Sequence, residues 1–229
     1  MTTDDSAGEQ DGRPLRSGRD TALALLALAL LWPLLLALAA AVRLDSRGPV
    51  IYSEERLGRD GKPFRIFKFR TLHPQPEDKR AVAPSGDPRV TRLGAWLRPV
   101  HLDELPQLLN IARGEMRIVG PRPTRKELWR GVDEALRRRA LAFTPGLTSP
   151  ASLRFDCEDD VLAETENPEQ IYHDVIFPAK VAMDVHHFEH PRRLSDTKLI
   201  LATVATVIGT RGDGNCRRRL ERLLSRAGC

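Results

Sequence analysis

The sequence of 229 residues predicts an α+β protein that is mostly helical, with one long apolar helix and a small β-hairpin. Three observations support this fold class. Residues 21–42 carry no charge, a turn containing Asp60-Gly61 separates two strand-like runs, and apolar residues recur at helical spacing through much of the remainder. A chain of this length can bury one core of ordinary size.

The composition narrows the functional classes. The formal net charge is +5, from 36 basic and 31 acidic residues, which suits an anionic ligand or a lipid surface but is too small to indicate nucleic-acid binding. Aromatic residues make up only 5%, which argues against a surface for stacking bases. The three cysteines are odd in number and have no CxxC spacing, so we expect no disulfide framework and a reducing compartment.

The N-terminal segment is the first structural feature. Residues 1–20 are polar and predict a disordered arm, and the uncharged run that follows would span roughly 33 Å as a straight helix. It can be interpreted as a signal peptide, as a transmembrane helix, or as a helix that kinks at Trp32-Pro33 and returns to the same face. Basic residues flank both ends. The physics of the sequence alone slightly favours the simple span.

The predicted hairpin carries an unusual face. The runs 50–52 and 64–70 flank its turn, and Lys68 and Arg70 alternate onto the same face as the apolar Ile66. Two cations on an apolar face suggest an anionic ligand. The alternative is an exposed strand edge protected by charge.

The next segment leads toward the centre of the chain. Residues 73–88 are rich in proline, glycine and charge and predict a flexible loop or lid. The following amphipathic helix should end near Arg98, because Pro99 disfavours helical backbone before it. Arg98 is then left five residues ahead of Asp103, at a turn.

The stretch 102–110 is the most informative part of the sequence. Asp103 and Glu104 precede Pro106 and an apolar run, which places the two carboxylates at the start of a helix. An acidic pair at such a position is ordinarily a cap. Here, however, a rigid turn follows, in which Arg122 stands between two prolines. A carboxylate pair with a fixed guanidinium nearby suggests phosphoryl chemistry on an anionic substrate.

The C-terminal half predicts helices. We expect a charged surface helix over 124–142, a helix over 171–190 interrupted near Pro178, and an apolar helix over 196–208 that is too short to span a bilayer. The histidines in the second of these are expected to be surface residues. With the basic tail 210–229, the last helix favours contact with an anionic membrane surface.

These motifs resemble those of the bacterial sugar transferases, the monotopic phosphoglycosyl transferases that act on polyprenol phosphate. The resemblance covers about residues 21–209, and its motifs lie at 48–52, 55–64, 68–71, 102–107 and 119–123. It implies a re-entrant membrane helix over 21–43 kinked at Pro33. It also implies a compact catalytic domain over 44–209, with interfacial amphipathic helices, on the cytoplasmic face of the bacterial inner membrane.

The resemblance also implies a reaction. A sugar 1-phosphate would pass from a UDP-sugar to polyprenyl phosphate through a covalent intermediate on Asp103, releasing UMP. Asp103 and Glu104 would hold Mg²⁺, and a homodimer through the membrane-facing helices is conceivable. The implied phosphate-binding residues are Lys68, Arg70, Arg98 and Arg122, and the implied pocket-shaping residues are Pro121, Pro123, Pro145, Gly146 and Thr148.

The resemblance leaves the sugar and three alternative functions open. Where the family commonly has glycine and an aromatic residue, this chain continues with Ser149-Pro150, which leaves the sugar undefined. A membrane-bound glycosyltransferase that moves the sugar alone would release UDP in place of UMP. A non-catalytic membrane adaptor and a secreted protein with a signal peptide are further alternatives.

Overall fold

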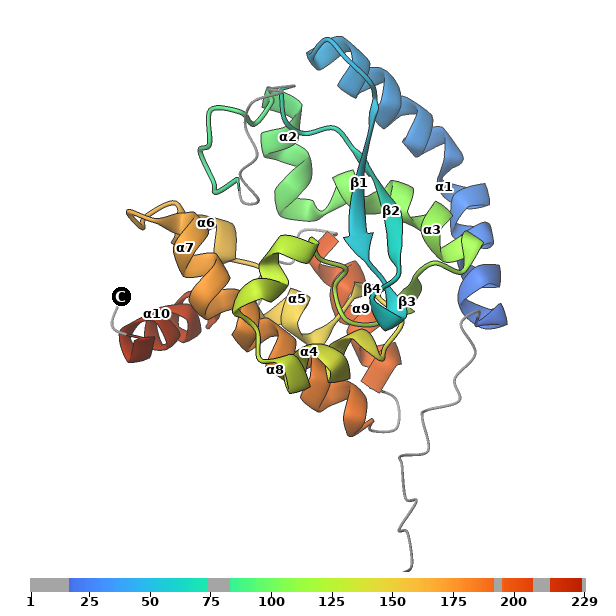
Figure 1. Cartoon of the computed structure of the whole chain (residues 1–229). Helices are drawn as coiled ribbons and strands as arrows, with labels where there is room; N and C mark the ends of the chain where they lie inside the picture. The colour runs from blue at the N-terminus through green and yellow to red at the C-terminus, as the bar shows by residue number, and fades with distance from the viewer. Residues whose placement is uncertain (1–16, 74–82, 192–194, 208–214, 228–229) are drawn as a thin grey trace, which may run out of the picture.

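The computed structural model describes residues 17–73, 83–191, 195–207 and 215–227. Figure 1 shows a mainly helical protein with α1 along one edge, the β1–β2 hairpin near the centre and α10 on the side away from α1. The predicted fold class is confirmed. The strands are β1 (Ile51–Leu57), β2 (Pro63–Phe69), β3 (Arg117–Val119) and β4 (Gly146–Thr148). The α-helices are α1 (Gly18–Asp45), α2 (Arg92–Leu97), α3 (Leu108–Arg113), α4 (Glu134–Leu141), α5 (Pro150–Arg154), α6 (Glu158–Leu162), α7 (Pro168–Ile171), α8 (Phe177–Glu189), α9 (Ser195–Val207) and α10 (Cys216–Ala227).

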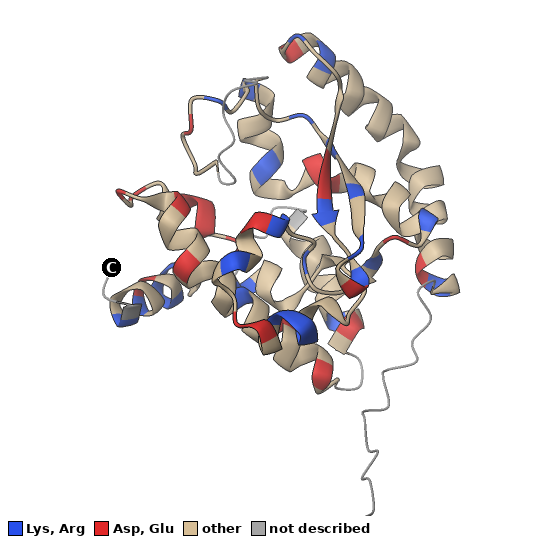
Figure 2. Ribbon diagram, in the orientation of Figure 1, with Lys and Arg blue, Asp and Glu red and all other residues tan. Residues whose placement is uncertain are grey.

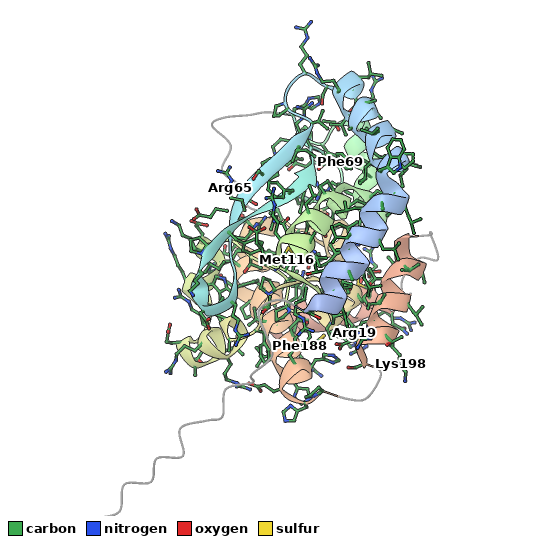
Figure 3. The ribbon with its side chains drawn as sticks, turned by 90° about the vertical axis from the view of Figure 1, so that its right-hand side faces the viewer. Arg19, Arg65, Phe69, Met116, Phe188 and Lys198 are labelled. Carbon is green, nitrogen blue, oxygen red and sulfur yellow. A yellow bond between two sulfur atoms is a disulfide. The ribbon has the colours of Figure 1, made fainter. Side chains whose placement is uncertain are left out.

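Helix α1 is longer than the predicted segment 21–43. It begins after Ser17, whose side chain caps the N–H of Asp20, and the helical assignment runs through Pro33 without interruption. The ribbon bends partway along its length (Figures 1 and 3), as expected where a proline removes one internal hydrogen bond. The re-entrant path through a membrane stays a prediction. The predicted disordered arm lies largely outside the described residues, because 1–16 are not among them.

One face of α1 packs against the domain along most of its length. Ala24 contacts a cluster that includes Ile66 of β2 and Met116, and Val42 contacts a second cluster with Phe69 and Leu97. Figure 3 shows Phe69 and Met116 beside this helix. Burial of these side chains supplies the apolar contact that holds α1 on β2, α2 and α3. The opposite face of α1 is apolar and exposed.

The hairpin forms as predicted. β1 and β2 pair in antiparallel register from Ile51 opposite Phe69 to Leu57 opposite Pro63. The turn contains a short 3₁₀ helix, η1 (Arg59–Gly61), in which Asp60 adopts a left-handed conformation with φ 58°. Asp tolerates that region better than most residues, and the Asp-Gly signal therefore predicted the turn correctly.

A second sheet was not predicted. β3 and β4 pair in parallel, and Gly120, directly after β3, lies against Gly146, the first residue of β4. A Cβ on Gly146 would lie 2.1 Å from the backbone nitrogen of Gly120, so only glycine allows the approach. This contact holds the segment before Pro121 against the segment that leads into α5.

The prediction of one continuous helix over 124–142 is wrong in the middle of that range. A 3₁₀ helix, η4 (Lys126–Gly131), ends at Val132, whose backbone is extended, and α4 then begins after Asp133. Asp133 starts α4, because its carboxylate accepts the N–H groups of residues 135 and 136. Apolar spacing alone did not reveal this cap.

The interruption predicted near Pro178 is confirmed. A π-helical turn, η5 (Tyr172–Ile176), joins α7 to α8, and Pro178 occupies the first turn of α8. Proline has no N–H to give to the preceding turn, so the wider helix forms where a regular one would lose a bond. The turn places Tyr172 inside the domain.

The C-terminal segment corrects one expectation and leaves another untested. Its helix α10 buries Cys216, Leu220 and Leu224 against α6 and η5, so its apolar side packs on the domain, and contact of its basic side with a membrane stays a prediction. Cys216 also forms a disulfide with Cys157, 59 residues earlier. The expectation of no disulfide framework therefore missed this one bond, because the two cysteines meet only through the packing of α10 and no local motif indicates it.

Candidate active site

The acidic pair lies on the wall of a cavity of about 220 Å³. The 3₁₀ helix η3 (Leu102–Gln107) contributes Asp103 and Glu104, β2 contributes Lys68, and the turn after β3 contributes Arg122. Further lining residues come from α5, α6, η5 and α8. Segments that are distant in the sequence therefore meet around two carboxylates.

Glu104 is held by two cations. The Nζ of Lys68 donates to its Oε1 at 2.6 Å, and the guanidinium of Arg122 donates to both oxygens, with Nη1 to Oε2 at 3.2 Å. Burial disfavours the charge of Glu104, but Arg122 and Lys68 outweigh it and hold its pKa well below the usual range. Glu104 is therefore ionised and is held in place by hydrogen bonds from Lys68 and Arg122.

Asp103 differs from its neighbour. Its side chain is buried, and among the described residues the structure records no hydrogen bond or ion pair to its carboxylate. Burial raises the pKa of Asp103, while Lys68 opposes that shift and Glu104 adds to it. The arrangement leaves one carboxylate of the pair available for a ligand or a reaction.

The backbone before η3 sets this geometry. His101 precedes η3 with φ 53°, a left-handed conformation that costs a non-glycine residue about 1–2 kcal/mol. The turn joins the 3₁₀ helix η2 (Arg98–Val100) to η3 and directs the acidic pair into the cavity. Strained backbone of this kind is often found at functional sites.

Arg98 and Arg122 line the cavity, as the sequence predicted. Arg122 is paired with Glu104, which raises the pKa of the guanidinium against the opposing effect of burial. Arg98 donates to the Oδ2 of Asp159 on α6 at 2.7 Å. Lys68 completes the predicted cations of the site.

Arg70 is the predicted site residue that the structure places elsewhere. Its guanidinium donates to the backbone oxygens of Pro49 at 2.5 Å and Ser46 at 2.6 Å, and to the Oγ of Ser46 at 2.8 Å. It does not belong to the described residues that line the cavity. Arg70 instead joins the end of α1 to β2, and its predicted phosphate contact stays a prediction that this position does not support.

The predicted pocket-shaping residues have separate positions. Pro123 lines the cavity, whereas Pro121 and Pro145 line a smaller apolar hollow of about 40 Å³. Gly146 and Thr148 line neither of these two cavities. Gly146 packs on Gly120, and the Oγ1 of Thr148 lies 2.6 Å from the Oγ1 of Thr203 on α9. These two residues therefore pack against neighbouring segments outside both cavities.

Sequence reasoning missed the opposite wall of the cavity. Lys180 of α8, Glu158 of α6 and Tyr172 of η5 line it, together with Phe155. A signal was present, because Lys180 falls on the inward stripe of α8 with the buried Phe177, Val181 and Val185. A cation at such a position indicates a buried partner or a ligand. Arg56 and Arg125, from β1 and the segment before η4, add further cations to the lining.

The donor set fits a magnesium ion bound together with a phosphate substrate. Mg²⁺ prefers carboxylate and phosphate oxygens and often takes only one or two carboxylates from the protein. Asp103 offers such a carboxylate, while both oxygens of Glu104 are engaged by Lys68 and Arg122. Asp103 is therefore the better ligand, and Glu104 would bind metal only by sharing an oxygen with a cation.

Known proteins with related sequences identify the family of this chain. A family model described as bacterial sugar transferase matches residues 12–210. The UDP-glucose:undecaprenyl-phosphate glucose-1-phosphate transferase of Caulobacter vibrioides is 38% identical, over 83% of this chain and 68% of that protein. The protein of the same name from Escherichia coli is 36% identical, over 84% of this chain and 40% of that protein.

A third relative carries a different sugar in its name. The UDP-N-acetylgalactosamine-undecaprenyl-phosphate N-acetylgalactosaminephosphotransferase of Aeromonas hydrophila is 41% identical, over 49% of this chain and 27% of that protein. The chain thus spans less than half the length of the E. coli and Aeromonas relatives. The family model covers most of the chain, and the Caulobacter relative aligns over two thirds of its own length. The chain belongs to the bacterial sugar transferase family.

Proposed function

We propose that this chain transfers a sugar 1-phosphate from a UDP-sugar to a polyprenyl phosphate, giving polyprenyl-diphosphate-sugar and UMP. The observation that carries this proposal is the unequal acidic pair: Glu104 is fixed between two cations, and Asp103 faces the same cavity without a recorded partner among the described residues. The names of the relatives support the two substrates, because they pair a UDP-sugar with undecaprenyl phosphate.

The arrangement suits a two-step reaction. Donor and acceptor are both anions, so direct attack of one on the other is opposed by charge repulsion. In the first step a carboxylate oxygen of Asp103 attacks the phosphorus that bears the sugar, the phosphorus–oxygen bond to UMP breaks, and a phosphosugar remains on Asp103. In the second step an oxygen of the lipid phosphate attacks that phosphorus and restores the carboxylate. Each step leaves one P–O bond formed and one broken.

The residues around Asp103 have separate tasks in this scheme. Lys68 and Arg122 offset the charge of the phosphoryl group, and Arg122 can do so with two parallel hydrogen bonds. Glu104 fixes both cations before the substrate binds, which reduces the reorganisation needed during the reaction. Because burial raises the pKa of Asp103, activity should fall at acid pH as this nucleophile becomes protonated.

We also propose that the donor binds with Mg²⁺. Asp103, with Glu104 beside it, would hold the ion together with diphosphate oxygens. The ion would neutralise part of the diphosphate charge and orient the departing UMP.

The contacts of α1 support a monotopic position in the membrane. Asp20 near its start pairs with Arg117 at 3.1 Å, and Asp45 at its end accepts the N–H of Leu93 at 3.3 Å. Both ends are thus bound to one polar domain, which cannot itself cross a bilayer. Between its ends α1 is almost free of charge (Figure 2), and Leu30 and Trp32 are 69% and 58% exposed. We propose that α1 enters the cytoplasmic leaflet and leaves on the same side.

The nucleophile is tested with Asp103→Asn. We expect the variant to lose turnover by several orders of magnitude and to form no phosphosugar adduct, because an amide cannot act as the nucleophile. The measurements are UMP release with a panel of UDP-sugars and polyprenyl phosphate, and mass spectrometry of trapped protein. Asp133→Asn, at the exposed cap of α4, is the matched control and should keep wild-type turnover. If Asp103→Asn still exchanges labelled UMP into UDP-sugar, the nucleophile is misassigned.

The same assay separates the alternative functions. An enzyme that transfers the sugar alone releases UDP, so the identity of the nucleotide product decides between the two reactions. An adaptor without activity would release neither nucleotide with any donor. The fixed Glu104 and its two cations favour the transferase, because an adaptor has no use for a desolvated carboxylate pair in a cavity.

A further inference from the structure

The wall opposite the acidic pair carries a buried ion pair. The Nζ of Lys180 donates to both carboxylate oxygens of Glu158, at 2.7 Å each. The side chain of Lys180 is only 8% exposed and that of Glu158 is 20% exposed. A buried ion pair of this kind adds little stability compared with well-packed apolar residues. Stabilisation of the fold therefore does not account for this pair, whereas a ligand-binding role would.

Two aromatic rings flank this ion pair. The Nζ of Lys180 lies 5.6 Å from the ring centroid of Tyr172 and 5.9 Å from that of Phe155. Burial disfavours the ammonium of Lys180, but Glu158 and Tyr172 outweigh it and raise its pKa, so the lysine stays charged. We call these four residues, Phe155, Glu158, Tyr172 and Lys180, the opposite wall.

The opposite wall shares the cavity with the reacting carboxylate. It also lies within electrostatic range of the arginine of the site. After Glu104, which dominates, Tyr172 and Glu158 are among the groups that raise the pKa of Arg122 against the effect of burial. Because Arg122 and the opposite wall line the same cavity, a group bonded to a phosphate at Arg122 can reach this wall.

That next group is the sugar. In a UDP-sugar the hexose is bonded directly to the phosphate that Asp103 attacks, whereas the uracil lies a further phosphate and a ribose away. The chemistry of the wall matches a hexose as well. A carboxylate accepts hydrogen bonds from two neighbouring hydroxyls, an ammonium donates to a hydroxyl oxygen, and an aromatic ring packs on the apolar face of the pyranose.

We propose that Glu158 and Lys180, with the rings of Phe155 and Tyr172, form the subsite that reads the hydroxyl groups of the donor sugar. This inference rests on the proposed function, because it assigns the part of the cavity that the transferred sugar would fill. A site built on buried polar groups rejects a sugar that lacks the matching hydroxyl, since those groups would then stay unpaired. The opposite wall would accordingly set which UDP-sugar the enzyme accepts.

The first experiment measures donor preference. Wild type, Lys180→Gln and Glu158→Gln are assayed for UMP release with UDP-glucose, UDP-galactose and their N-acetyl derivatives. We expect the ratio of kcat/KM between the best donor and the next to fall about 10- to 100-fold in the variants, the range for one lost hydrogen bond to a charged group. Inhibition by UMP should stay within about twofold of wild type, because the nucleotide does not reach the wall.

The matched control is an ion pair outside the cavity. Glu189, also on α8, pairs with Arg139 through bonds to both of its oxygens, and Arg139 is 54% exposed. Glu189→Gln should leave the donor ratio unchanged. Thermal unfolding of each variant in detergent identifies any that fails to fold, and Lys180→Arg, which keeps the charge, should retain most of the wild-type preference.

A second experiment needs no variant. Wild-type enzyme is assayed with donors that each lack one hydroxyl of the preferred sugar, and at least one should lose about 10-fold or more in kcat/KM. The inference is overturned if every deoxy donor reacts like its parent. It is equally overturned if the variants weaken all donors and UMP alike, since the wall would then bind the nucleotide, or if the donor ratio does not change. Absence of UMP release by wild type with any donor would instead contradict the proposed function.

Discussion

Lys68 and Arg70 lie two residues apart on the same face of β2, yet they have different partners. Lys68 reaches Glu104 in the cavity, whereas Arg70 donates to Ser46 and Pro49 at the end of α1. The alternation of the strand predicted that both cations face inward. It could not predict which of them meets a carboxylate and which meets backbone, because those partners come from other elements.

The first prediction separates these two roles. Arg70→Met should lower the free energy of unfolding by about 1–3 kcal/mol, because the backbone oxygens of Ser46 and Pro49 lose their buried donors. Its KM for the UDP-sugar should stay near that of wild type. Lys68→Met is the matched comparison and should impair turnover with a smaller effect on stability. The measurements are chemical denaturation in detergent and steady-state UMP release. A raised KM in Arg70→Met without lost stability would restore the original phosphate-binding role.

The second prediction concerns Asp184, which links three segments. Its Oδ1 accepts the N–H of Ala151 at 2.9 Å, and its carboxylate also binds the side chain of Ser149 and the backbone of Arg122. Burial raises the pKa of Asp184 to about 6, although those hydrogen bonds and Lys180 oppose the shift. The unfolded chain holds the same proton less tightly, with a pKa near 3.8.

The effect on stability follows from these two pKa values. Between about pH 4 and pH 6 the folded protein binds more protons at Asp184 than the unfolded chain, so the free energy of unfolding decreases as the pH rises through this window. The total loss is roughly 3 kcal/mol, from a shift of about two units at 1.36 kcal/mol each. Subtracting the profile of Asp184→Asn from that of wild type isolates this group in denaturation curves at pH 4.5, 5.5 and 7. A difference that does not change across the window would contradict the assignment.

At the scale of elements, local signals predicted local structure. The Asp-Gly turn predicted the hairpin, Pro99 predicted the end of the helix near Arg98, and the acidic pair before Pro106 predicted the start of η3. Each of these depends on residues within one turn of the chain. The candidate site could be predicted from the sequence to the same extent. The motifs located Asp103 and Glu104, whereas the wall that carries Lys180 is formed by helices that meet only through tertiary contacts.

Pairings between distant segments were missed for the same reason. The parallel contact of β3 with β4 depends on the close approach of Gly120 and Gly146, and neither strand exceeds three residues. The disulfide between Cys157 and Cys216 depends on the docking of α10 onto α6. The residue pattern within one segment does not indicate which distant segment it will contact.

The third prediction tests that disulfide. Closing a loop of 59 residues in the unfolded chain is worth about 4 kcal/mol on the chain-entropy scale. We expect Cys157→Ser, or treatment of wild type with dithiothreitol, to lower the free energy of unfolding by up to that amount. Cys229→Ser, at a residue outside the described part of the chain, is the control and should have no such effect. Thiol titration of denatured wild-type protein should find one free thiol, and three would contradict the pairing.

At the scale of the whole molecule, the apolar outer face of α1 is a large exposed hydrophobic surface. Large side chains at 23, 25, 26, 30, 32 and 36 are exposed, which is the pattern expected of a lipid contact. The helix is long and apolar enough to cross a bilayer by length and composition. The contacts of its two ends distinguish crossing from re-entry, since Asp20 and Asp45 are both tied to the domain.

The fourth prediction is therefore about the two termini. If α1 re-enters, an epitope tag at the N-terminus and one at the C-terminus should both be removed by protease added to inside-out membrane vesicles, and both should be protected in spheroplasts. A helix that crosses would expose only one tag in each preparation. Crossing would also break the Asp20–Arg117 pair or pull charged residues of the domain into hydrocarbon, which costs several kcal/mol for each unpaired group. Opposite accessibility of the two tags would thus refute the position proposed for the catalytic cavity, at the surface from which a lipid phosphate can reach Asp103.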